Sequence, residues 1–296
     1  MTPKIAVEDL SRYGWFDIVP VRGARCKEDW TIQGIMGKIC IMSQSSVIVT
    51  GASRGLGRAI ALELARMGAA VTLNARTESA LAQVKAEIEA LGGRVEMLAG
   101  DVSAPDVAER LVAAAVLAFG RVDAIVNNAA VLTPLARIAE SDSVEWQRNL
   151  QINVVGPYLL IQAALPHLRR APQGRVINIS SGAAVRPTAG WSAYCAGKAA
   201  LNMLTAVLAE EEPAIVALAV RPGVVDTAMQ VALREQGRAA MEPKAYQRFI
   251  DAYAQGALLP PERPGRALAA LALHAPLAWS GRFISWDDPE VQALAG

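Results

Sequence analysis

From Val47 onward, short apolar runs alternate with longer segments of helical periodicity, and this alternation restricts the possible folds of the 296-residue chain more than any other feature. The runs predict strands at 47–50, 70–74, 95–99, 122–127, 176–180, 215–220 and 282–285. Helices are expected at 58–67, 77–91, 104–119 with Ser103 as cap, 144–169, 191–209 and in parts of 228–255. Because parallel neighbours need crossover connections, we expect an α/β fold with one doubly wound parallel sheet flanked by helices.

Residues 1–41 differ from the rest, because they mix charged, aromatic and turn residues and show neither helical nor strand periodicity. A second methionine, Met42, directly precedes a sequence that is typical of a first strand. We therefore expect 1–41 to be a disordered extension or the product of an upstream start codon, with an arm that contacts a neighbouring subunit as the alternative. Residues 42–296 are expected to form one domain.

Composition excludes several classes of protein. Hydrophobic residues make up 53% and charged residues 19%, which argues against a disordered chain. With 29 basic and 28 acidic side chains, no charge excess favours nucleic acid or a membrane as partner. Three cysteines and two histidines, without metal-ligand spacing, predict neither a disulfide framework nor a metal site. No segment is a transmembrane candidate, so we expect a soluble protein of a reducing compartment such as the cytoplasm.

A glycine-rich turn joins the first strand to the first helix in the segment Thr50-Gly-Ala-Ser-Arg-Gly-Leu-Gly57. Glycines permit a tight turn and a close approach of backbone to a pyrophosphate, and a helix N-terminus offers free N–H groups. The G-x-x-x-G-x-G spacing differs from the commonest dinucleotide fingerprint, but its position at a strand–helix junction predicts a dinucleotide site.

The end of the second strand indicates which dinucleotide is bound. An NAD site usually has a carboxylate there for the ribose 2′-hydroxyl. This chain has Ala75 at about that position, followed by Arg76, and Arg54 lies in the glycine turn. Two arginines could bind a 2′-phosphate, so we expect NADP(H); the alternative is that both are ordinary surface arginines.

A second cluster of polar residues follows the 176–180 strand. Tyr194 and Lys198 are four residues apart on the expected 191–209 helix, so both project from one face. An adjacent ammonium would pull the phenol pKa toward neutral pH and make the tyrosine a better acid. Ser181 lies at the carboxyl end of a strand, where open α/β sheets bind ligands. Asn153 lies within an expected helix. The alternative to a functional role is that it is simply a polar residue in that helix.

Together these motifs resemble the short-chain dehydrogenase/reductase family, classical type. The resemblance covers essentially 42–296 and rests on the glycine turn, Asp101-Val102, Asn127-Asn-Ala-Ala130, Asn153, Ser181, Tyr194-Cys-Ala-Gly-Lys198 and Arg221-Pro-Gly-Val-Val-Asp-Thr227. It implies a single-domain Rossmann fold and a catalytic tetrad. Tyr194 would donate the proton, Ser181 would orient the substrate oxygen, Lys198 would bind the nicotinamide ribose, and Asn153 would hold a proton-relay water.

The resemblance also implies the cofactor contacts: Asp101 would meet the adenine and Asn128 the ribose side, while the segment after the sixth strand would flank the nicotinamide. The expected cofactor-binding residues are Gly51, Ser53, Arg54, Gly55, Leu56, Gly57, Asn74, Arg76, Asp101, Val102, Asn128, Ala129, Tyr194, Lys198, Pro222, Gly223, Val225 and Thr227. One departure is Ala130, where the family usually has glycine.

The stretch 222–230 is similar to that of sepiapterin reductase and benzil reductase, which reduce vicinal dicarbonyl groups; Asp226 could equally cap a helix. The expected substrate pocket consists of Ser181, Trp191, Asp226 and Met229, with 228–259 as its lid. The expected function is that of an NADPH-dependent carbonyl reductase acting on a ketone, diketone or aldehyde. The alternatives are a silent NADP(H) sensor and an alcohol dehydrogenase that works in the oxidative direction. The family resemblance further implies a homodimer or homotetramer built by the 144–169 and 191–209 helices.

Overall fold

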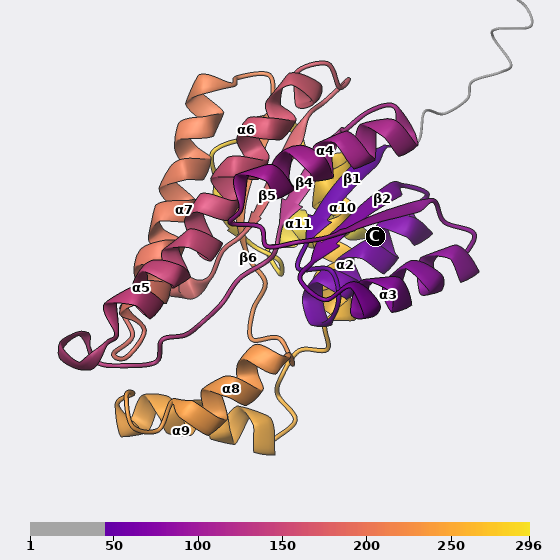
Figure 1. The fold of residues 1–296 in the computed structure, drawn as a ribbon. Helices are drawn as coiled ribbons and strands as arrows, with labels where there is room; N and C mark the ends of the chain where they lie inside the picture. The colour runs from indigo at the N-terminus through magenta and orange to yellow at the C-terminus, as the bar shows by residue number, and fades with distance from the viewer. Residues whose placement is uncertain (1–44) are drawn as a thin grey trace, which may run out of the picture. The chain divides into compact units, whose positions relative to one another are not determined.

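A computed structural model describes residues 45–296 of the chain. The expectations for 1–41, and for the cysteines at positions 26 and 40, lie outside these residues. Seven parallel strands form one sheet in the order β3-β2-β1-β4-β5-β6-β7 (Figure 1). The strands are β1 (Ser46–Thr50), β2 (Ala70–Ala75), β3 (Val95–Ala99), β4 (Ala124–Asn127), β5 (Arg175–Ile179), β6 (Val216–Arg221) and β7 (Phe283–Ser285). The expected doubly wound parallel sheet is therefore confirmed.

Helices cover both faces of the sheet, and the side chains of each strand alternate between the two hydrophobic cores. On β1, Val47 and Val49 belong to one core and Ile48 belongs to the other. The first core is closed by α2 (Gly55–Arg66), α3 (Glu78–Ala90), α10 (Glu262–His274) and α11 (Pro289–Ala295). The second is closed by α4 (Pro105–Phe119), α6 (Gly156–Leu168) and α7 (Ser192–Glu211). Strands buried on both faces explain the nearly continuous apolar runs in the sequence.

The winding reverses at β1, which pairs with β2 on one side and β4 on the other. A crevice forms at such a switch point, beyond the carboxyl ends of the strands, and open α/β sheets bind their ligands there. The segments that follow β1, β4, β5 and β6 all leave the sheet at these carboxyl ends. These segments carry most of the residues that the sequence assigned to the site.

The expected 144–169 helix is interrupted. Residues Ser143–Leu150 form α5, residues Gln151–Val155 form a π-helical turn, and α6 begins at Gly156. Pro157 contributes to the interruption, because it has no N–H to give to the carbonyl four residues earlier, that of Asn153. Such π turns occur frequently at functional sites.

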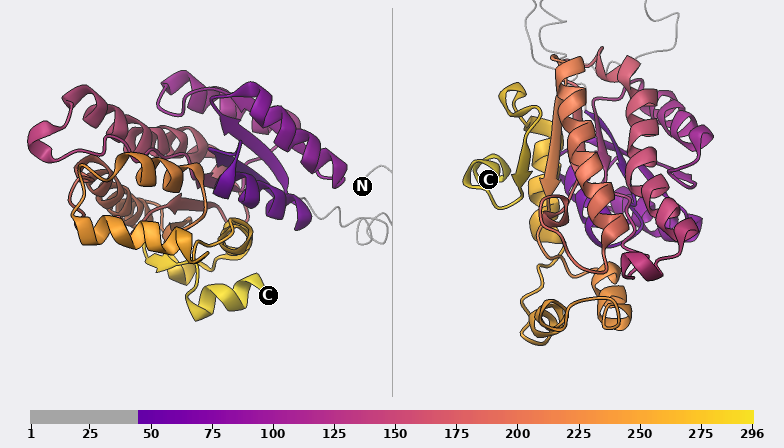
Figure 2. Two further views of the ribbon diagram at one scale, coloured as in Figure 1. Left: turned by 90° about the horizontal axis from the view of Figure 1, so that it is seen from below. Right: turned by 90° about the vertical axis from the view of Figure 1, so that its left-hand side faces the viewer.

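Two helices, α8 (Ala228–Gln236) and α9 (Pro243–Ala254), form a pair outside the sheet-and-helix layers (Figures 1 and 2). Their base is closed by backbone contacts: the Asp226 N–H donates to Leu259 O at 2.8 Å and the Leu259 N–H donates to Val224 O at 2.9 Å. The pair therefore leaves and rejoins the body of the protein at one place.

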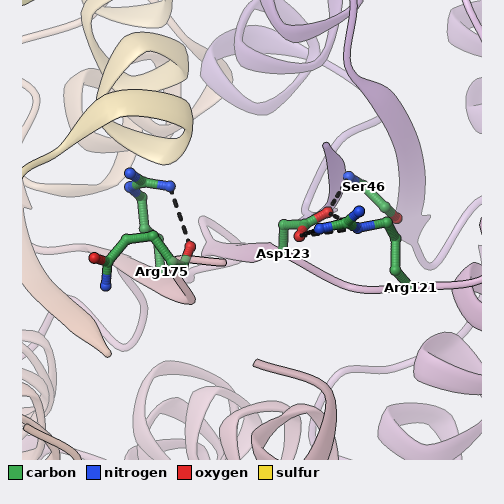
Figure 3. Close-up of polar contacts among 5 residues, drawn as sticks. Ser46, Arg121, Asp123 and Arg175 are labelled. Carbon is green, nitrogen blue, oxygen red and sulfur yellow. Dashed lines mark hydrogen bonds and ion pairs between the residues drawn. The ribbon is translucent and has the colours of Figure 1, made fainter. Parts of the chain in front are cut away.

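At the opposite end of the sheet, where the strands begin, a buried carboxylate connects the starts of two neighbouring strands (Figure 3). Asp123 accepts the backbone N–H of Ser46 at 2.8 Å and two hydrogen bonds from Arg121 Nε at 2.8 and 3.0 Å. Nearby, the Arg175 guanidinium donates to Ala275 O at 3.0 Å. Burial lowers the pKa of Arg175, and the charge of Asp123 opposes this shift. This end of the sheet is structural, since the glycine turn and the other residues that the sequence assigned to the site lie at the carboxyl ends of the strands.

Some local expectations were wrong. Ser103 does not cap the helix after β3: Ala104 is at the N-cap position of α4, without a side-chain cap, and the Ser103 hydroxyl donates to Asp101 Oδ1 at 2.6 Å. Thr227, and not Asp226, occupies the N-cap position of α8. Helices α10 and α11 were not predicted. Over residues 45–296, no helix combines the length and the apolar character needed to cross a membrane.

Candidate active site

The glycine turn after β1 requires its glycines for two different reasons. Gly51 has a φ of +65°, a conformation that residues with a Cβ rarely adopt. A Cβ on Gly57 would lie only 2.2 Å from Gly51 O, so the first turn of α2 can pack on the loop only with glycine there. The N-terminus of α2 has neither a side-chain cap nor an acidic residue in its first turn. Its free N–H groups and positive dipole end suit a pyrophosphate, so this cradle fits a dinucleotide.

Asn128, at the carboxyl end of β4, holds the glycine turn in place. Its Nδ2 donates to Thr50 O at 3.0 Å and to Gly51 O at 3.2 Å. The Thr50 hydroxyl in turn accepts the backbone N–H groups of Asn128 and Ala129, both at 3.1 Å. The sequence assigned Asn128 and Ala129 to cofactor binding. In the structure they fix the shape of the cradle, and Asn128 also lines the adjoining cavity.

The end of β2 has no carboxylate. Ala75 is buried there, and the side chains of Arg76 and Arg54 are exposed. Within 45–296, no hydrogen bond or ion pair is found for either guanidinium, so both are free to bind an anion. Asn74, expected at the cofactor, is instead fully buried, and its Nδ2 donates to Leu98 O at 3.0 Å and Gly100 O at 3.3 Å. These bonds join β2 to β3, while the buried Oδ1 of Asn74 has no hydrogen-bond partner within the described residues.

Asp101 and Val102 follow β3 at the same edge. Asp101 accepts the backbone N–H of Ser103 at 2.9 Å and forms an ion pair with Arg148 of α5. Burial acts against ionisation of Asp101, but the hydrogen bonds from Ser103 and the contact with Arg148 outweigh it and lower the pKa of the carboxyl group. Val102 packs against Gly156 at the start of α6. A Cβ added to Gly156 would lie 3.0 Å from Val102 Cγ2.

A cavity of about 700 Å³ extends from the glycine turn to the helical pair α8–α9. Eight of the expected cofactor-binding residues line it: Leu56, Asn128, Tyr194, Lys198, Pro222, Gly223, Val225 and Thr227. Expected residues that do not line it are Gly51, Ser53, Arg54, Gly55, Gly57, Asn74, Arg76, Asp101, Val102 and Ala129. Most of the second group surrounds the cradle for the phosphates. Ala130, the departure from the family pattern, also lines the cavity, where its methyl group occupies space beside the cofactor crevice.

Three members of the expected tetrad face this cavity: Ser181, Tyr194 and Lys198. The Ser181 hydroxyl lies close enough to the phenol of Tyr194 to favour its phenolate form by hydrogen bonding, and it accepts the N–H of Ala183 at 3.2 Å. The Lys198 Nζ lies 5.6 Å from the centroid of the Tyr194 ring and donates to Ile179 O at 2.7 Å. A hydroxyl, a phenol and an ammonium therefore meet at the end of β5, as the sequence predicted.

The pKa of the phenol shifts in the direction opposite to that expected. Burial raises the pKa of Tyr194 to about 12, although the hydrogen bond to Ser181 acts in the opposite direction. Burial also lowers the pKa of Lys198 to about 8. The physical reason is that water is excluded from both groups, which disfavours phenolate and ammonium alike. At this site the cost of burial outweighs the attraction that the sequence argument relied on.

Asn153 lies behind the cavity wall in the π-helical turn and is fully buried. Its side chain makes three hydrogen bonds: Oδ1 accepts the Val131 N–H at 3.0 Å, and Nδ2 donates to Val131 O at 2.8 Å and Asn149 Oδ1 at 2.7 Å. The backbone carbonyl of Asn153 is a second acceptor here, since Pro157 has no N–H to close an α-helical bond with it.

A buried polar face of α7, which the sequence analysis missed, places the catalytic residues. Ser180 donates to Asn202 Oδ1 at 2.5 Å, and Asn178 Nδ2 donates to Thr205 Oγ1 at 2.8 Å. With Lys198 these contacts follow an i, i+4, i+7 pattern, so one face of α7 is fastened along β5. This stripe of polar residues on a mostly apolar helix is the sequence signal that could have identified Asn202 and Thr205 as contacts of the β5 segment.

The substrate side of the cavity contains three of the four expected residues. Trp191 lies edge-on to Tyr194, with ring centroids 5.9 Å apart, and its ring is 5.6 Å from that of Phe249 on α9. Ser181 and Met229 also line the cavity, whereas Asp226 is exposed and is not among its lining residues. Met229 and Phe249 come from the helical pair α8–α9, so the expected lid segment does cover the cavity. The sequence analysis missed Arg186, Thr188, Gln230 and Arg248, which also line it.

Comparison with known proteins agrees with this geometry. A family model described as short chain dehydrogenase matches residues 45–238. A benzil reductase ((S)-benzoin forming) of Saccharomyces cerevisiae is 34% identical over 272 residues, which cover 88% of this chain and 100% of the relative. A sepiapterin reductase of Mus musculus is 34% identical over 226 residues, covering 72% of this chain and 85% of the relative.

Solved structures show the same fold. A short chain dehydrogenase/reductase from Saccharomyces cerevisiae superposes with a TM-score of 0.80 at 35% identity, covering 84% of this chain and 99% of that chain. A short chain dehydrogenase from Shigella flexneri, solved in complex with NADP, gives a TM-score of 0.70 at 28% identity, covering 82% of this chain and 97% of that chain.

Proposed function

Since this chain belongs to the short-chain dehydrogenase/reductase family, we propose that it is an NADPH-dependent carbonyl reductase that acts on a ketone, diketone or aldehyde. The observation that carries the proposal is the meeting of Ser181, Tyr194 and Lys198 at one wall of a cavity that begins beside the glycine turn. Bound NADPH would supply a hydride to the carbonyl carbon, and the chain must then supply a proton to the carbonyl oxygen.

Tyr194 is in the right protonation state for this task. Its raised pKa of about 12 keeps the phenol neutral at physiological pH. A neutral phenol can donate a hydrogen bond to the carbonyl oxygen and then transfer the proton, because the alkoxide that develops there is a stronger base than a phenolate. Alcohol oxidation would instead need the phenolate as base. The raised pKa therefore favours the reductive direction.

Ser181 and Lys198 prepare this proton transfer. The Ser181 hydroxyl, beside the phenol at the same cavity wall, would donate to the same carbonyl oxygen and so orient it. The Lys198 ammonium would bind the ribose hydroxyls of the cofactor and stabilise the phenolate left after the transfer. Its bond to Ile179 O holds it in place before any ligand arrives.

The choice of NADPH over NADH rests on charge. Arg76 is exposed directly after β2, beside buried Ala75, where an NAD-binding protein would have a carboxylate, and Arg54 is exposed in the glycine turn after β1. A 2′-phosphate on the cofactor would meet two cations there, and a plain ribose would gain no such contact. The NADP complex of the Shigella flexneri relative supports the same choice.

For the substrate, we propose that vicinal dicarbonyl compounds are preferred over simple ketones. The support is the benzil reductase relative, which is matched over its whole length, together with a cavity wall built from Trp191, Met229 and Phe249. These apolar side chains suit an aromatic or alkyl substituent on the carbonyl.

We also propose that the protein is a homodimer or homotetramer. Helices α5, α6 and α7 expose apolar side chains: Val144 is 73% exposed, Tyr158 45%, Met203 65% and Val207 42%. Side chains of this kind on outer helices indicate a surface that a second copy would cover.

The proposed function is tested by following NADPH oxidation at 340 nm with a panel of aldehydes, simple ketones, vicinal diketones and quinones, with NADH as the parallel cofactor. We expect turnover with NADPH and the highest kcat/KM with a diketone. A protein that binds NADPH tightly and turns over none of the panel would be a sensor, and the proposal would be rejected.

A further inference from the structure

Two arginines line the substrate side of the cavity and have no anionic partner. Arg186 lies on the segment between Ser181 and α7, and Arg248 lies on α9 next to Phe249. Both side chains are exposed, and no hydrogen bond, ion pair or ring contact is found for either guanidinium within residues 45–296. They come from two different parts of the fold, Arg186 from the segment that follows Ser181 and Arg248 from helix α9 of the pair that covers the cavity.

Many other arginines of the described chain have such partners. Arg58 pairs with Glu87, Arg169 with Glu212, and Arg282 with Glu290, and each pair joins two elements of the fold. Arg175 instead donates to the backbone carbonyl of Ala275, so the arginines that stabilise this fold contact a carboxylate or a backbone oxygen. Arg186 and Arg248 have no such match at positions that face a ligand cavity.

The wall between them contains one more unused donor. Trp191 is 8% exposed, and its indole N–H is buried without a hydrogen-bond partner. Its ring contacts Tyr194 on one side and Phe249, the neighbour of Arg248, on the other. A buried N–H without a partner is costly in the free protein, and an acceptor atom on a ligand would remove that cost if the ring or the helical pair shifts slightly.

Negative charge is scarce in the cavity. Asp287 is the one carboxylate among its lining residues, and it accepts the hydroxyl of Ser285 at the β7 end, where Arg221 also lines the cavity. The acidic and basic groups at that end balance each other. The excess of positive charge therefore lies on the side of Arg186 and Arg248.

From this arrangement we propose that the physiological substrate carries an anionic group, a carboxylate, which Arg186 and Arg248 bind while the carbonyl meets Ser181 and Tyr194. This inference rests on the proposed carbonyl reductase function and adds the substrate class. Guanidinium groups bind carboxylates through paired N–H donors, and two of them in one cavity would fix the orientation of the substrate. The substrate is then a keto acid with its carboxylate beyond the reacting carbonyl.

A pair of substrates that differ only in charge tests the proposal. The probes are 4-carboxybenzil and its methyl ester, which share the diketone and the ring system. The measured quantity is the ratio of kcat/KM for the acid to kcat/KM for the ester. We expect this ratio to fall about tenfold in Arg186→Gln or Arg248→Gln and further in the double variant, as for a lost charge-assisted hydrogen bond. Comparing ratios between variants cancels the small difference in intrinsic reactivity of the two probes.

The matched control is Arg238→Gln. Arg238 is an exposed arginine between α8 and α9 that does not line the cavity. The Arg238→Gln substitution also removes one positive charge from the α8–α9 region, but not from the cavity lining. It should therefore leave the acid-to-ester ratio of kcat/KM unchanged. If Arg238→Gln lowers the ratio as much as the other two substitutions, or if the double variant keeps the native ratio, the carboxylate site is refuted.

A binding measurement separates this inference from the proposed function. The mono-alcohol derived from 4-carboxybenzil and the corresponding methyl ester are titrated into the NADP⁺ complex by calorimetry. Tighter binding of the acid, lost in the Arg186→Gln/Arg248→Gln variant, supports the site even if no carbonyl is reduced. Reduction of the ester together with equal binding of acid and ester would leave the reductase proposal standing and reject the carboxylate site.

Discussion

The Lys198 ammonium donates a 2.7 Å hydrogen bond to the carbonyl oxygen of Ile179, the last residue of β5. This contact connects the two elements that carry the chemistry, because Ser181 lies two residues beyond Ile179 and Tyr194 lies one helical turn before Lys198. One buried bond thus sets the position of the phenol relative to the serine hydroxyl. The groups are held in place by the fold before any substrate is bound, as catalysis by positioned donors requires.

The first prediction concerns pH. The pKa of Lys198 is lowered to about 8 by burial, so the ammonium is present below that pH and lost above it. Tyr194, with a pKa of about 12, stays protonated throughout. We therefore expect kcat/KM for NADPH, which reports the free enzyme, to be level below about pH 7.5 and to fall as pH rises through about 8. A profile that stays flat to about pH 10 would contradict the lowered pKa of Lys198, because a lysine with the ordinary pKa of about 10.4 keeps its charge up to that pH.

The second prediction concerns the cofactor. Arg76→Asp places a carboxylate where NAD-binding proteins have one and removes a cation from the 2′-phosphate site. We expect the Kd for NADPH to rise about tenfold or more, equivalent to about 1.5–3 kcal/mol, while NADH binding improves. Fluorescence titration of both cofactors measures this. Equal affinity of the unmodified protein for NADPH and NADH would contradict the argument from Ala75 and Arg76.

The third prediction concerns the glycine turn. Gly57→Ala adds a methyl group whose carbon would lie 2.2 Å from Gly51 O, so either the loop or α2 must move. We expect NADPH affinity to drop by about 10²-fold, equivalent to about 2.7 kcal/mol. Gly68→Ala is the control for a general effect of replacing glycine, since Gly68 lies after α2, outside the cradle, and no atom lies within 4 Å of its added Cβ. NADPH binding by Gly57→Ala as tight as that of Gly68→Ala would disprove the role of the cradle.

The elements of this fold were largely predictable because buried parallel strands leave an unbroken apolar signal. Strand β1, whose residues are all buried, covers the predicted 47–50 and begins one residue earlier, at Ser46. Helix α10 was missed because Pro264 and Gly265 lie in its first turn and look like a loop. The structure explains the glycine: a Cβ there would lie 2.9 Å from Ala59 Cβ on α2, so the two helices touch at this point. A contact between distant segments is not visible in local sequence.

The candidate site was predictable only in part, for a similar reason. Ser181, Tyr194 and Lys198 carry their own chemistry and a fixed spacing, so they could be assigned from the chain alone. The pKa direction of Tyr194 could not, because it depends on how much water the fold excludes. Arg186 and Arg248 could not be assigned either, since an exposed arginine becomes part of a cavity only through the placement of α9.

The fourth prediction concerns substrate preference. We expect a vicinal diketone to have a higher kcat/KM than an aldehyde of similar electrophilicity, and Met229→Ala to reduce that advantage, because Met229 lines the cavity beside the proposed carbonyl position. Intrinsic reactivity cancels when the diketone-to-aldehyde ratio is compared between the native protein and the variant. If the ratio follows electrophilicity alone and does not change in Met229→Ala, the chain does not recognise dicarbonyl compounds.

The central claim is that Tyr194 donates the proton in an NADPH-dependent reduction, and a single-turnover experiment with Tyr194→Phe tests it most directly. The variant keeps the aromatic ring that packs against Trp191 and loses only the hydroxyl, so its Kd for NADPH should stay within about twofold of the native value. The rate of NADPH oxidation on mixing the preformed complex with benzil should fall by about 10²-fold or more, the scale of a lost general acid. A Tyr194→Phe complex that oxidises NADPH at the native rate would contradict the account.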